Sequence, residues 1–255
     1  MNQILLSATN AAHEAGKIIH SFFHSEFEVK MKGIGNPVTE ADIAADEILK
    51  KILTAEFPDY GWLSEETRDT PDRLSKKRVW VVDPNDGTKE FVEGIPNFVV
   101  SIGLVENGVP ILGVIHNPIN KDTYSAILGK GVFFNGKQTI VNAKTKFSEI
   151  SMLNSRSETQ QGLWESYIPH FKKLIPIGSI ALKLAMVAAN QKNMVASLKP
   201  KNEWDICAGH CLINEAGGIL LTIEGKKITY NNSRTLIIPG LVAGNESVVN
   251  GFIKL

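Results

Sequence analysis

Cysteine is nearly absent from this 255-residue sequence, which contains only Cys207 and Cys211. If both lie on one helix, their four-residue spacing puts them on the same face, where the geometry for a disulfide is poor. We therefore interpret them as reduced residues of the core. So few cysteines are typical of a protein from a reducing compartment.

The sequence also lacks net charge, because 27 Lys and Arg balance 27 Asp and Glu. Binding to nucleic acid phosphates needs a basic surplus, and so does a polybasic membrane anchor. No apolar run approaches the ~18 residues of a membrane span. Residues 1–6 lack the basic and long apolar regions of a signal peptide. We expect a cytoplasmic protein with neither a nucleic acid polymer nor a membrane as partner.

Internal repeats, low-complexity segments and a clear linker are missing too. The 43% of hydrophobic residues is enough for a core and excludes a disordered chain. The length predicts one large domain or two closely packed lobes. We predict an N-terminal α+β lobe at residues 1–146 and a C-terminal α/β lobe at residues 147–255, joined in one compact body.

Hydrophobic periodicity predicts helices first, then a largely antiparallel sheet, then alternating strands and helices. Thr39 is a plausible helix N-cap, with Asp42 at the capping-box position. Asn107-Gly108 and Asn135-Gly136 indicate hairpin turns. Helices are expected at residues 4–23, 39–57, 160–172, 179–190, 204–216 and 245–253. Strands are expected at residues 79–82, 98–105, 109–115, 174–177, 194–197, 219–223 and 236–242.

The most informative segment is DPNDGT at residues 83–88, directly after a predicted buried strand. Pro84 fixes φ and Gly87 allows positive φ, so the geometry of the expected turn is constrained. Asp83 and Asp86 repel each other unless a cation lies between them, and hard oxygen ligands suit Mg²⁺. If a helix begins after Gly87, its first N–H groups suit a phosphate. An Asx-type turn with solvated acids is the alternative interpretation, and we favour the metal and phosphate site.

Two further acidic segments strengthen the case for a metal site. Glu65 and Glu66 directly follow apolar residues, and Asp205 stands at the beginning of an apolar helix. Taken alone, the first pair is better interpreted as a solvated loop or helix start, and the aspartate as a helix cap.

Together these segments resemble the inositol monophosphatase superfamily of lithium-sensitive, Mg²⁺-dependent phosphomonoesterases. The resemblance spans nearly the whole chain, and the segments occur in family order. It implies an α/β (α+β) fold, the layered αβαβα sandwich. The matching segments are PVTEAD at 37–42, SEE at 64–66, DPNDGT at 83–88, WDICAG at 204–209 and EAGG at 215–218.

The resemblance also implies a metal-assisted hydrolysis with two or three Mg²⁺ per site. One ion would be held by Glu65, Asp83 and the backbone carbonyl of Asn85. Asp83 would bridge to a second ion, held also by Asp86 and Asp205. Metals placed in this way clamp the attacking and leaving oxygens and lower the pKa of a water.

Further roles follow from the same resemblance. Glu65 and Thr88 would orient the attacking water, with Asp42 close behind the site, although a helix-capping role for Asp42 is equally consistent with the sequence. Asn85 departs from the family, which usually has an aliphatic residue there, and its amide could shift the loop geometry or the metal preference. Predicted substrate-binding residues are Gly87, Thr88, Lys89, Ser179 and Lys183.

The substrate is a small-molecule phosphate ester, for which two branches compete. Lys89 and Lys183 favour the 3′(2′),5′-bisphosphate nucleotidases, the CysQ-like branch, which remove the 3′-phosphate of adenosine 3′,5′-bisphosphate. Ile180 replaces a serine usual in that branch, and Leu198 replaces a glutamate usual in inositol-1-monophosphatases. We favour the nucleotidase, as a monomer or homodimer. The sequence also leaves open a catalytically silent metal or phosphate sensor and a metal-free glycosidase using Glu65 or Glu66.

Overall fold

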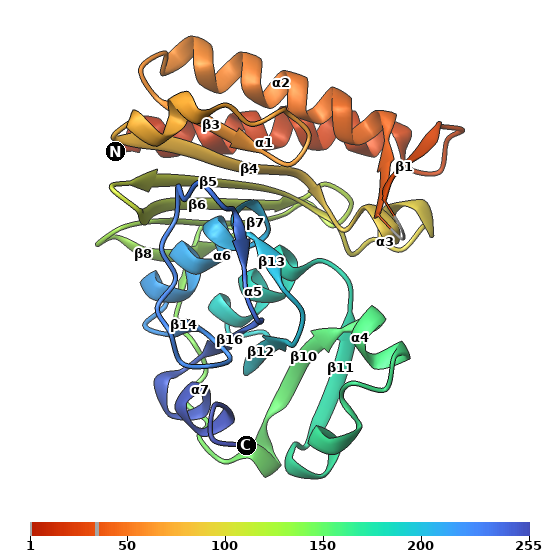
Figure 1. The fold of residues 1–255 in the computed structure, drawn as a ribbon, viewed down its shortest axis with the longest axis vertical. Coiled ribbons are helices and arrows are strands. Elements are labelled where there is room, and N and C mark those ends of the chain that lie inside the picture. The colour runs from red at the N-terminus through yellow and green to blue at the C-terminus, as the bar shows by residue number, and fades with distance from the viewer. Residues whose placement is uncertain (1, 34–35) are drawn as a thin grey trace.

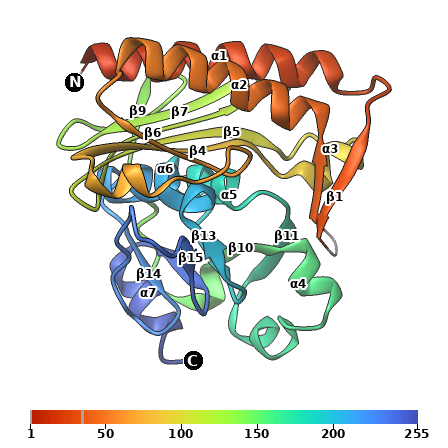
Figure 2. The same cartoon turned by 45° about the horizontal axis from the view of Figure 1, so that its top comes forward.

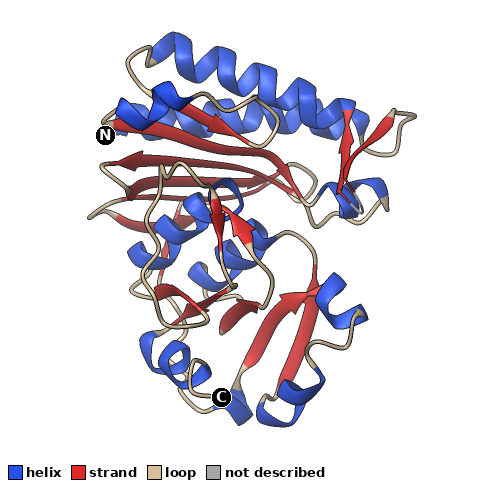
Figure 3. Cartoon of the chain, viewed as in Figure 1, coloured by secondary structure: helices blue, strands red, loops and turns tan. Residues whose placement is uncertain are grey.

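The computed structural model describes residues 2–33 and 36–255. It has five layers, helix–sheet–helix–sheet–helix, as Figures 1 and 3 show. The outer pair of helices covers a seven-stranded sheet (Figure 2), and a second pair fills the space between the two sheets. The predicted αβαβα class is confirmed. The helices are α1 (Asn2–Phe22) and α2 (Glu40–Glu56) outside, α5 (Ile180–Ala188) and α6 (Glu203–Glu215) between the sheets, and α7 (Glu246–Phe252) on the far side.

The larger sheet is antiparallel apart from its first pair of strands, which is parallel. Both predicted hairpin turns are confirmed, and Asn107, Gly108, Asn135 and Gly136 all have positive φ. The strands of this larger sheet, in spatial order, are β3 (Gly61–Ser64), β4 (Arg78–Asp86), β5 (Val99–Glu106), β6 (Val109–Asn117), β7 (Asp122–Ile127), β8 (Gly131–Phe134) and β9 (Lys137–Thr139).

The smaller sheet combines a parallel half with an antiparallel half. Its strands, in spatial order, are β11 (Lys173–Ile177), β10 (Ser151–Ser155), β12 (Met194–Ser197), β16 (Leu241–Gly244) and β14 (Ile219–Thr222). Two small ribbons stand apart: β1 (Val29–Gly33) with β2 (Asn36–Thr39), and β13 (Lys201–Asn202) with β15 (Leu236–Ile237). Short helices α3 (Thr88–Val92) and α4 (Arg156–Gln160) follow β4 and β10.

One buried core includes residues from both predicted lobes, for example Val81 of β4 and Leu220 of β14. Cys207 and Cys211 lie on α6 inside this core and are not joined, as expected. The division of the chain at residues 146 and 147 stays a prediction. Among the described residues, no helix combines the length and apolarity needed to cross a membrane.

Close packing of α6 on the larger sheet depends on two glycines, Gly103 of β5 and Gly113 of β6. A Cβ on Gly103 would lie 2.5 Å from the Sγ of Cys207, and one on Gly113 would collide with the carbonyl oxygen of Ala208. These glycines let the helix that carries Asp205 lie directly on the strands.

We expect Gly113→Ala to lower the free energy of unfolding by about 1–3 kcal/mol, because a backbone carbonyl cannot move aside as a side chain can. Urea unfolding followed by circular dichroism measures this change. Gly33→Ala is the matched control, since a Cβ there meets no atom of residues 2–33 and 36–255 within 4 Å. An equal loss in both variants would show that packing against α6 is not the cause.

Several predicted elements are wrong in detail. The helix expected at 160–172 is replaced by the end of α4 and a 3₁₀ segment, Glu165–His170, because Gly162 has φ 73° and Pro169 lacks an N–H. The strand expected at 236–242 is two strands, β15 and β16, separated by Pro239 and Gly240. β3 and β10 were not predicted as strands.

The expected turn after residue 82 is also different in the structure. β4 continues to Asp86, with an irregularity in its pairing with β5 between Asp83 and Asp86. Pro84 lies inside this irregularity, where its missing N–H costs no ladder hydrogen bond. The two aspartates are therefore carried by a bulged strand, and Gly87, with φ 113°, makes the turn into α3.

Candidate active site and metal centre

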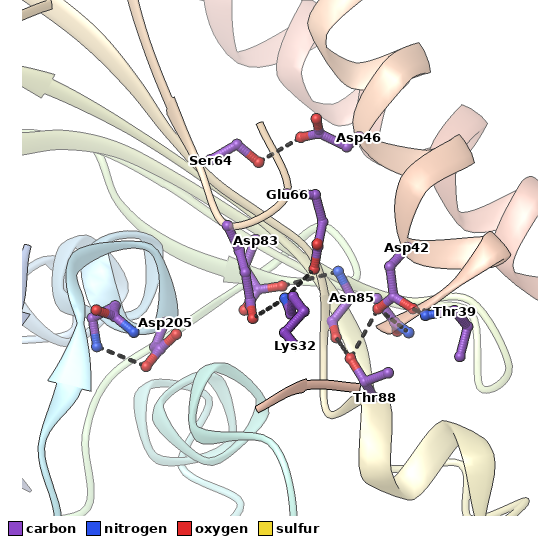
Figure 4. A network of polar contacts seen from close by, with 12 residues as sticks. Lys32, Thr39, Asp42, Asp46, Ser64, Glu66, Asp83, Asn85, Thr88 and Asp205 are labelled. Atoms are coloured by element: carbon purple, nitrogen blue, oxygen red, sulfur yellow. Dashed lines mark hydrogen bonds and ion pairs between the residues drawn. The ribbon is translucent and has the colours of Figure 1, made fainter. Parts of the chain in front are cut away.

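Three carboxylates from distant parts of the chain meet beside the end of β4. Glu65 follows β3, Asp83 lies in β4, and Asp205 lies in the first turn of α6. Their nearest carboxylate oxygens are all within 4.8 Å of one another. The parallel pairing of Ser64 with Val82 puts Glu65 next to Asp83, and the close packing of α6 brings in Asp205. Figure 4 shows Asp83 and Asp205 on the two sides of this space.

The electrostatics of the cluster favour a bound cation. Burial raises the pKa of Asp83 well above its usual range, and the charges of Glu65, Asp86 and Asp205 raise it further. Burial raises the pKa of Asp205 to about 8, again with help from Glu65 and Asp86. Carboxylates this close are costly without a counter-charge. The donor set is entirely hard oxygen, which fits a divalent cation such as Mg²⁺.

Asp86 is fixed by the beginning of α5. One carboxylate oxygen accepts hydrogen bonds from the Ser179 hydroxyl and the Ala181 N–H, both at 2.6 Å. Burial raises the pKa of Asp86 to about 6, although these two bonds and the charge of Lys183 oppose the rise. The other carboxylate oxygen has no hydrogen-bond partner among the described residues, and Asp86 lines the cavity described below.

Behind the cluster, Asp42 organises Asn85 and Thr88 (Figure 4). Its Oδ1 accepts from the Thr88 hydroxyl at 2.8 Å and from Asn85 Nδ2 at 3.2 Å, and its Oδ2 accepts from the Thr39 N–H at 2.7 Å. The last bond confirms the predicted capping box. Burial raises the pKa of Asp42 even though these bonds lower it. Asp42 thus caps α2 and also orients Thr88.

The side-chain amide of Asn85 is turned toward Asp42, and its backbone contacts Asp83 and Thr88. Its N–H donates to Asp83 Oδ1 at 3.0 Å, and its carbonyl oxygen accepts from the Thr88 hydroxyl at 3.2 Å. The side-chain Oδ1 is buried and has no hydrogen-bond partner among the described residues. The departure from the usual aliphatic residue therefore adds a contact to Asp42 and leaves the carbonyl in place.

A cavity of about 420 Å³ opens in front of the cluster. Four of the predicted acids line it: Glu65, Asp83, Asp86 and Asp205. All predicted substrate-binding residues line it as well: Gly87, Thr88, Lys89, Ser179 and Lys183. Of the other acids named from the sequence, Asp42 is not part of the cavity lining and Glu66 lines a neighbouring cavity.

A sequence model of the inositol monophosphatase family matches residues 1–250. The chain belongs to this family. It is 31% identical to inositol monophosphatase 3 of Solanum lycopersicum, with 100% of this chain and 96% of that protein covered. It is 32% identical to the 3′(2′),5′-bisphosphate nucleotidase CysQ of Haemophilus influenzae, with 97% and 93% covered. The superfamily predicted from the sequence is confirmed.

Solved structures support the same assignment. The extragenic suppressor protein suhB from Bartonella henselae superposes with a TM-score of 0.88 at 29% identity, covering 99% of this chain and 97% of the other. As a member of the inositol monophosphatase family, the chain is a phosphatase that acts on small-molecule phosphate esters. Relatives of both names match at similar identity, so they do not distinguish the two substrate branches.

Two side chains of this family member were missed by sequence analysis. The Lys32 ammonium, from β1, donates to Glu65 Oε1 and Glu66 Oε1, each at 2.7 Å. Burial raises the pKa of Glu66 to about 7, and this ion pair opposes the rise. Asp46 of α2 accepts from the Ser64 hydroxyl beside Glu65 (Figure 4). Asp46 lies four residues after Asp42 on the same helix face, a spacing that could have indicated it.

Proposed function

We propose that the protein is a Mg²⁺-dependent phosphomonoesterase that removes the 3′-phosphate of adenosine 3′,5′-bisphosphate. The observation that carries the metal part is the cluster of Glu65, Asp83 and Asp205 at the inner end of the cavity. The substrate part is supported by the cationic side chains around the same cavity, since a substrate with two phosphates needs more positive charge than one phosphate does. These cations are Lys89, Arg156, Lys183 and Lys201.

In this proposal the carboxylates of Glu65, Asp83, Asp86 and Asp205, with the carbonyl of Asn85, hold the metal. Bound Mg²⁺ supplies neutralisation of the carboxylates, polarisation of the phosphoryl group and a lowered pKa for a water. Phosphoryl transfer needs positioning and charge neutralisation more than covalent help. The task of the protein's own side chains is therefore to hold the water and the phosphate in line.

Thr88 and Glu65 are suited to hold the attacking water. When the Thr88 hydroxyl donates its single proton to Asp42, its lone pairs are free to accept a hydrogen bond from water. Glu65 accepts a second hydrogen bond from that water on the other side of the cavity. Asp42 acts through Thr88 and is a positioning residue. The hydroxyl protons of Thr88 and Ser179 are donated to Asp42 and Asp86. The backbone N–H groups of Gly87 and Thr88, at the beginning of α3, are the groups that would donate to the phosphate.

Inositol 1-phosphate is the second candidate substrate, and the tomato relatives' names favour it. Release of inorganic phosphate, measured with Mg²⁺, compares adenosine 3′,5′-bisphosphate, inositol 1-phosphate, fructose 1,6-bisphosphate and NADP. A preference of about tenfold corresponds to about 1.4 kcal/mol in transition-state binding and decides between the branches. Mg²⁺ binding without phosphate release from any of them would favour the silent sensor instead.

A further inference from the structure

The cavity is lined by carboxylates and by basic side chains, and the basic groups differ in what they contact. Arg156 donates to Glu90 at 2.8 Å and to Glu93 at 2.7 Å, so two carboxylates neutralise it. Lys183 is 3% exposed, and its ammonium donates to the carbonyl of Ile177 at 2.9 Å. Neither Arg156 nor Lys183 can move toward a bound substrate without breaking one of these contacts.

Lys201 differs from both. It lies in β13, four residues before Asp205, and lines the cavity. Its ammonium contacts only backbone carbonyls of its own loop, Lys199 at 3.3 Å and Pro200 at 3.1 Å. Among residues 2–33 and 36–255 it has no carboxylate partner. Carbonyls of a short loop are weak partners for an ammonium, so an anion can replace them at small cost.

Lys201 lines the same cavity as Asp205 and Lys183. β13 leads directly into α6, whose first turn carries Asp205, one of the candidate metal ligands. Lys201 is not itself a member of the carboxylate cluster. A phosphate bound by Lys201 would therefore leave the candidate metal ligands in place.

We propose that Lys201 binds the second phosphate of a bisphosphate substrate, the one that is not hydrolysed. This inference rests on the proposed function and adds the residue that distinguishes bisphosphates from monophosphates. Lys183, which is buried and lines the same cavity, adds a second positive charge. For adenosine 3′,5′-bisphosphate, Lys201 would contact the 5′-phosphate, which stays on the product.

The test compares adenosine 3′,5′-bisphosphate with adenosine 3′-monophosphate, which has the same scissile phosphate and lacks the other. We expect Lys201→Gln to lower kcat/KM for the bisphosphate by about tenfold to a hundredfold, the value of a hydrogen bond to a charged group. For the monophosphate we expect a change within about twofold. Lys201→Arg should keep most of the preference, because it keeps the charge.

Product inhibition gives a second readout. Adenosine 5′-monophosphate retains the phosphate assigned to Lys201, so it should inhibit hydrolysis of 4-nitrophenyl phosphate more weakly in Lys201→Gln than in the unmodified enzyme. Inhibition by adenosine should be the same in both. Lys199→Gln is the matched control, since Lys199 is exposed on the same loop and its ammonium donates to Gln161 outside the cavity.

The outcomes separate the two proposals. If the unmodified enzyme hydrolyses the bisphosphate and Lys201→Gln keeps the preference, the role of Lys201 is wrong and the proposed function stands. An equal effect of Lys199→Gln would also overturn it, because general loop charge would then be responsible. If the unmodified enzyme does not hydrolyse the bisphosphate, the proposed function fails together with this inference.

Discussion

Replacing Asp83 by Asn is expected to lower kcat/KM by about a thousandfold or more, equivalent to about 4 kcal/mol of transition-state stabilisation. Asp83 is the buried member of the three-carboxylate cluster and would hold the metal together with Glu65 and Asp205. The amide is of the same size and can still accept the Asn85 N–H, so the bulge in β4 should persist. Steady-state phosphate release with saturating Mg²⁺ measures the loss.

The same variant should be more stable than the unmodified protein when no metal is present. Burial and the nearby charges of Glu65 and Asp86 make ionised Asp83 unfavourable, and Asn removes that cost. Higher thermal stability in EDTA, together with lost activity, distinguishes a missing metal ligand from misfolding. Asp122→Asn, on β7 outside the site, is the control and should change neither property. Activity of Asp83→Asn within about tenfold of normal would overturn the metal assignment.

The acidic site was predictable because its residues are concentrated in three short segments. The segment DPNDGT supplies Asp83 and Asp86 at the end of one strand. Asp205 follows Trp204 at the beginning of a strongly apolar helix. Glu65 and Asp205 lie far apart along the chain, so only the resemblance to the family placed them in one site. The parallel pairing of β3 with β4 and the glycines beneath α6 bring them together, and neither could be read from spacing alone.

Contacts that depend on tertiary packing were not predictable. Lys32 reaches Glu65 and Glu66 from a short ribbon that is exposed along its whole length, and the alternation of apolar and polar residues there could indicate a strand but not this contact. The ion pair of Arg156 with Glu90 joins residues 66 positions apart. The helix predicted at residues 160–172 failed for a local reason, although the apolar residues there do have helical spacing. Gly162 and Pro169 interrupted the backbone, and local conformation overrode the pattern.

Removing Mg²⁺ with EDTA is expected to abolish activity and to destabilise the protein more as pH rises from 6.5 to 8. Folded Asp205, with its pKa raised to about 8, holds a proton that the unfolded chain releases near pH 4. Stability of the metal-free protein therefore falls with rising pH, by at most about 1.4 kcal/mol per pH unit for each extra proton held. Metal binding needs the deprotonated carboxylates, so the stabilisation by Mg²⁺ grows over the same range.

The quantity to measure is the difference in melting temperature between samples with Mg²⁺ and with EDTA at each pH. Buried His116 and His210, with pKa lowered to about 4, add stability as pH rises toward 6.5. Neither histidine ring lines the cavity, so their contribution to stability is the same with and without metal. It therefore cancels in the difference in melting temperature between the Mg²⁺ and EDTA samples. In Asp205→Asn the difference should be small and nearly independent of pH. A large difference that stays flat with pH in the unmodified protein would mean that the metal binds away from this cluster.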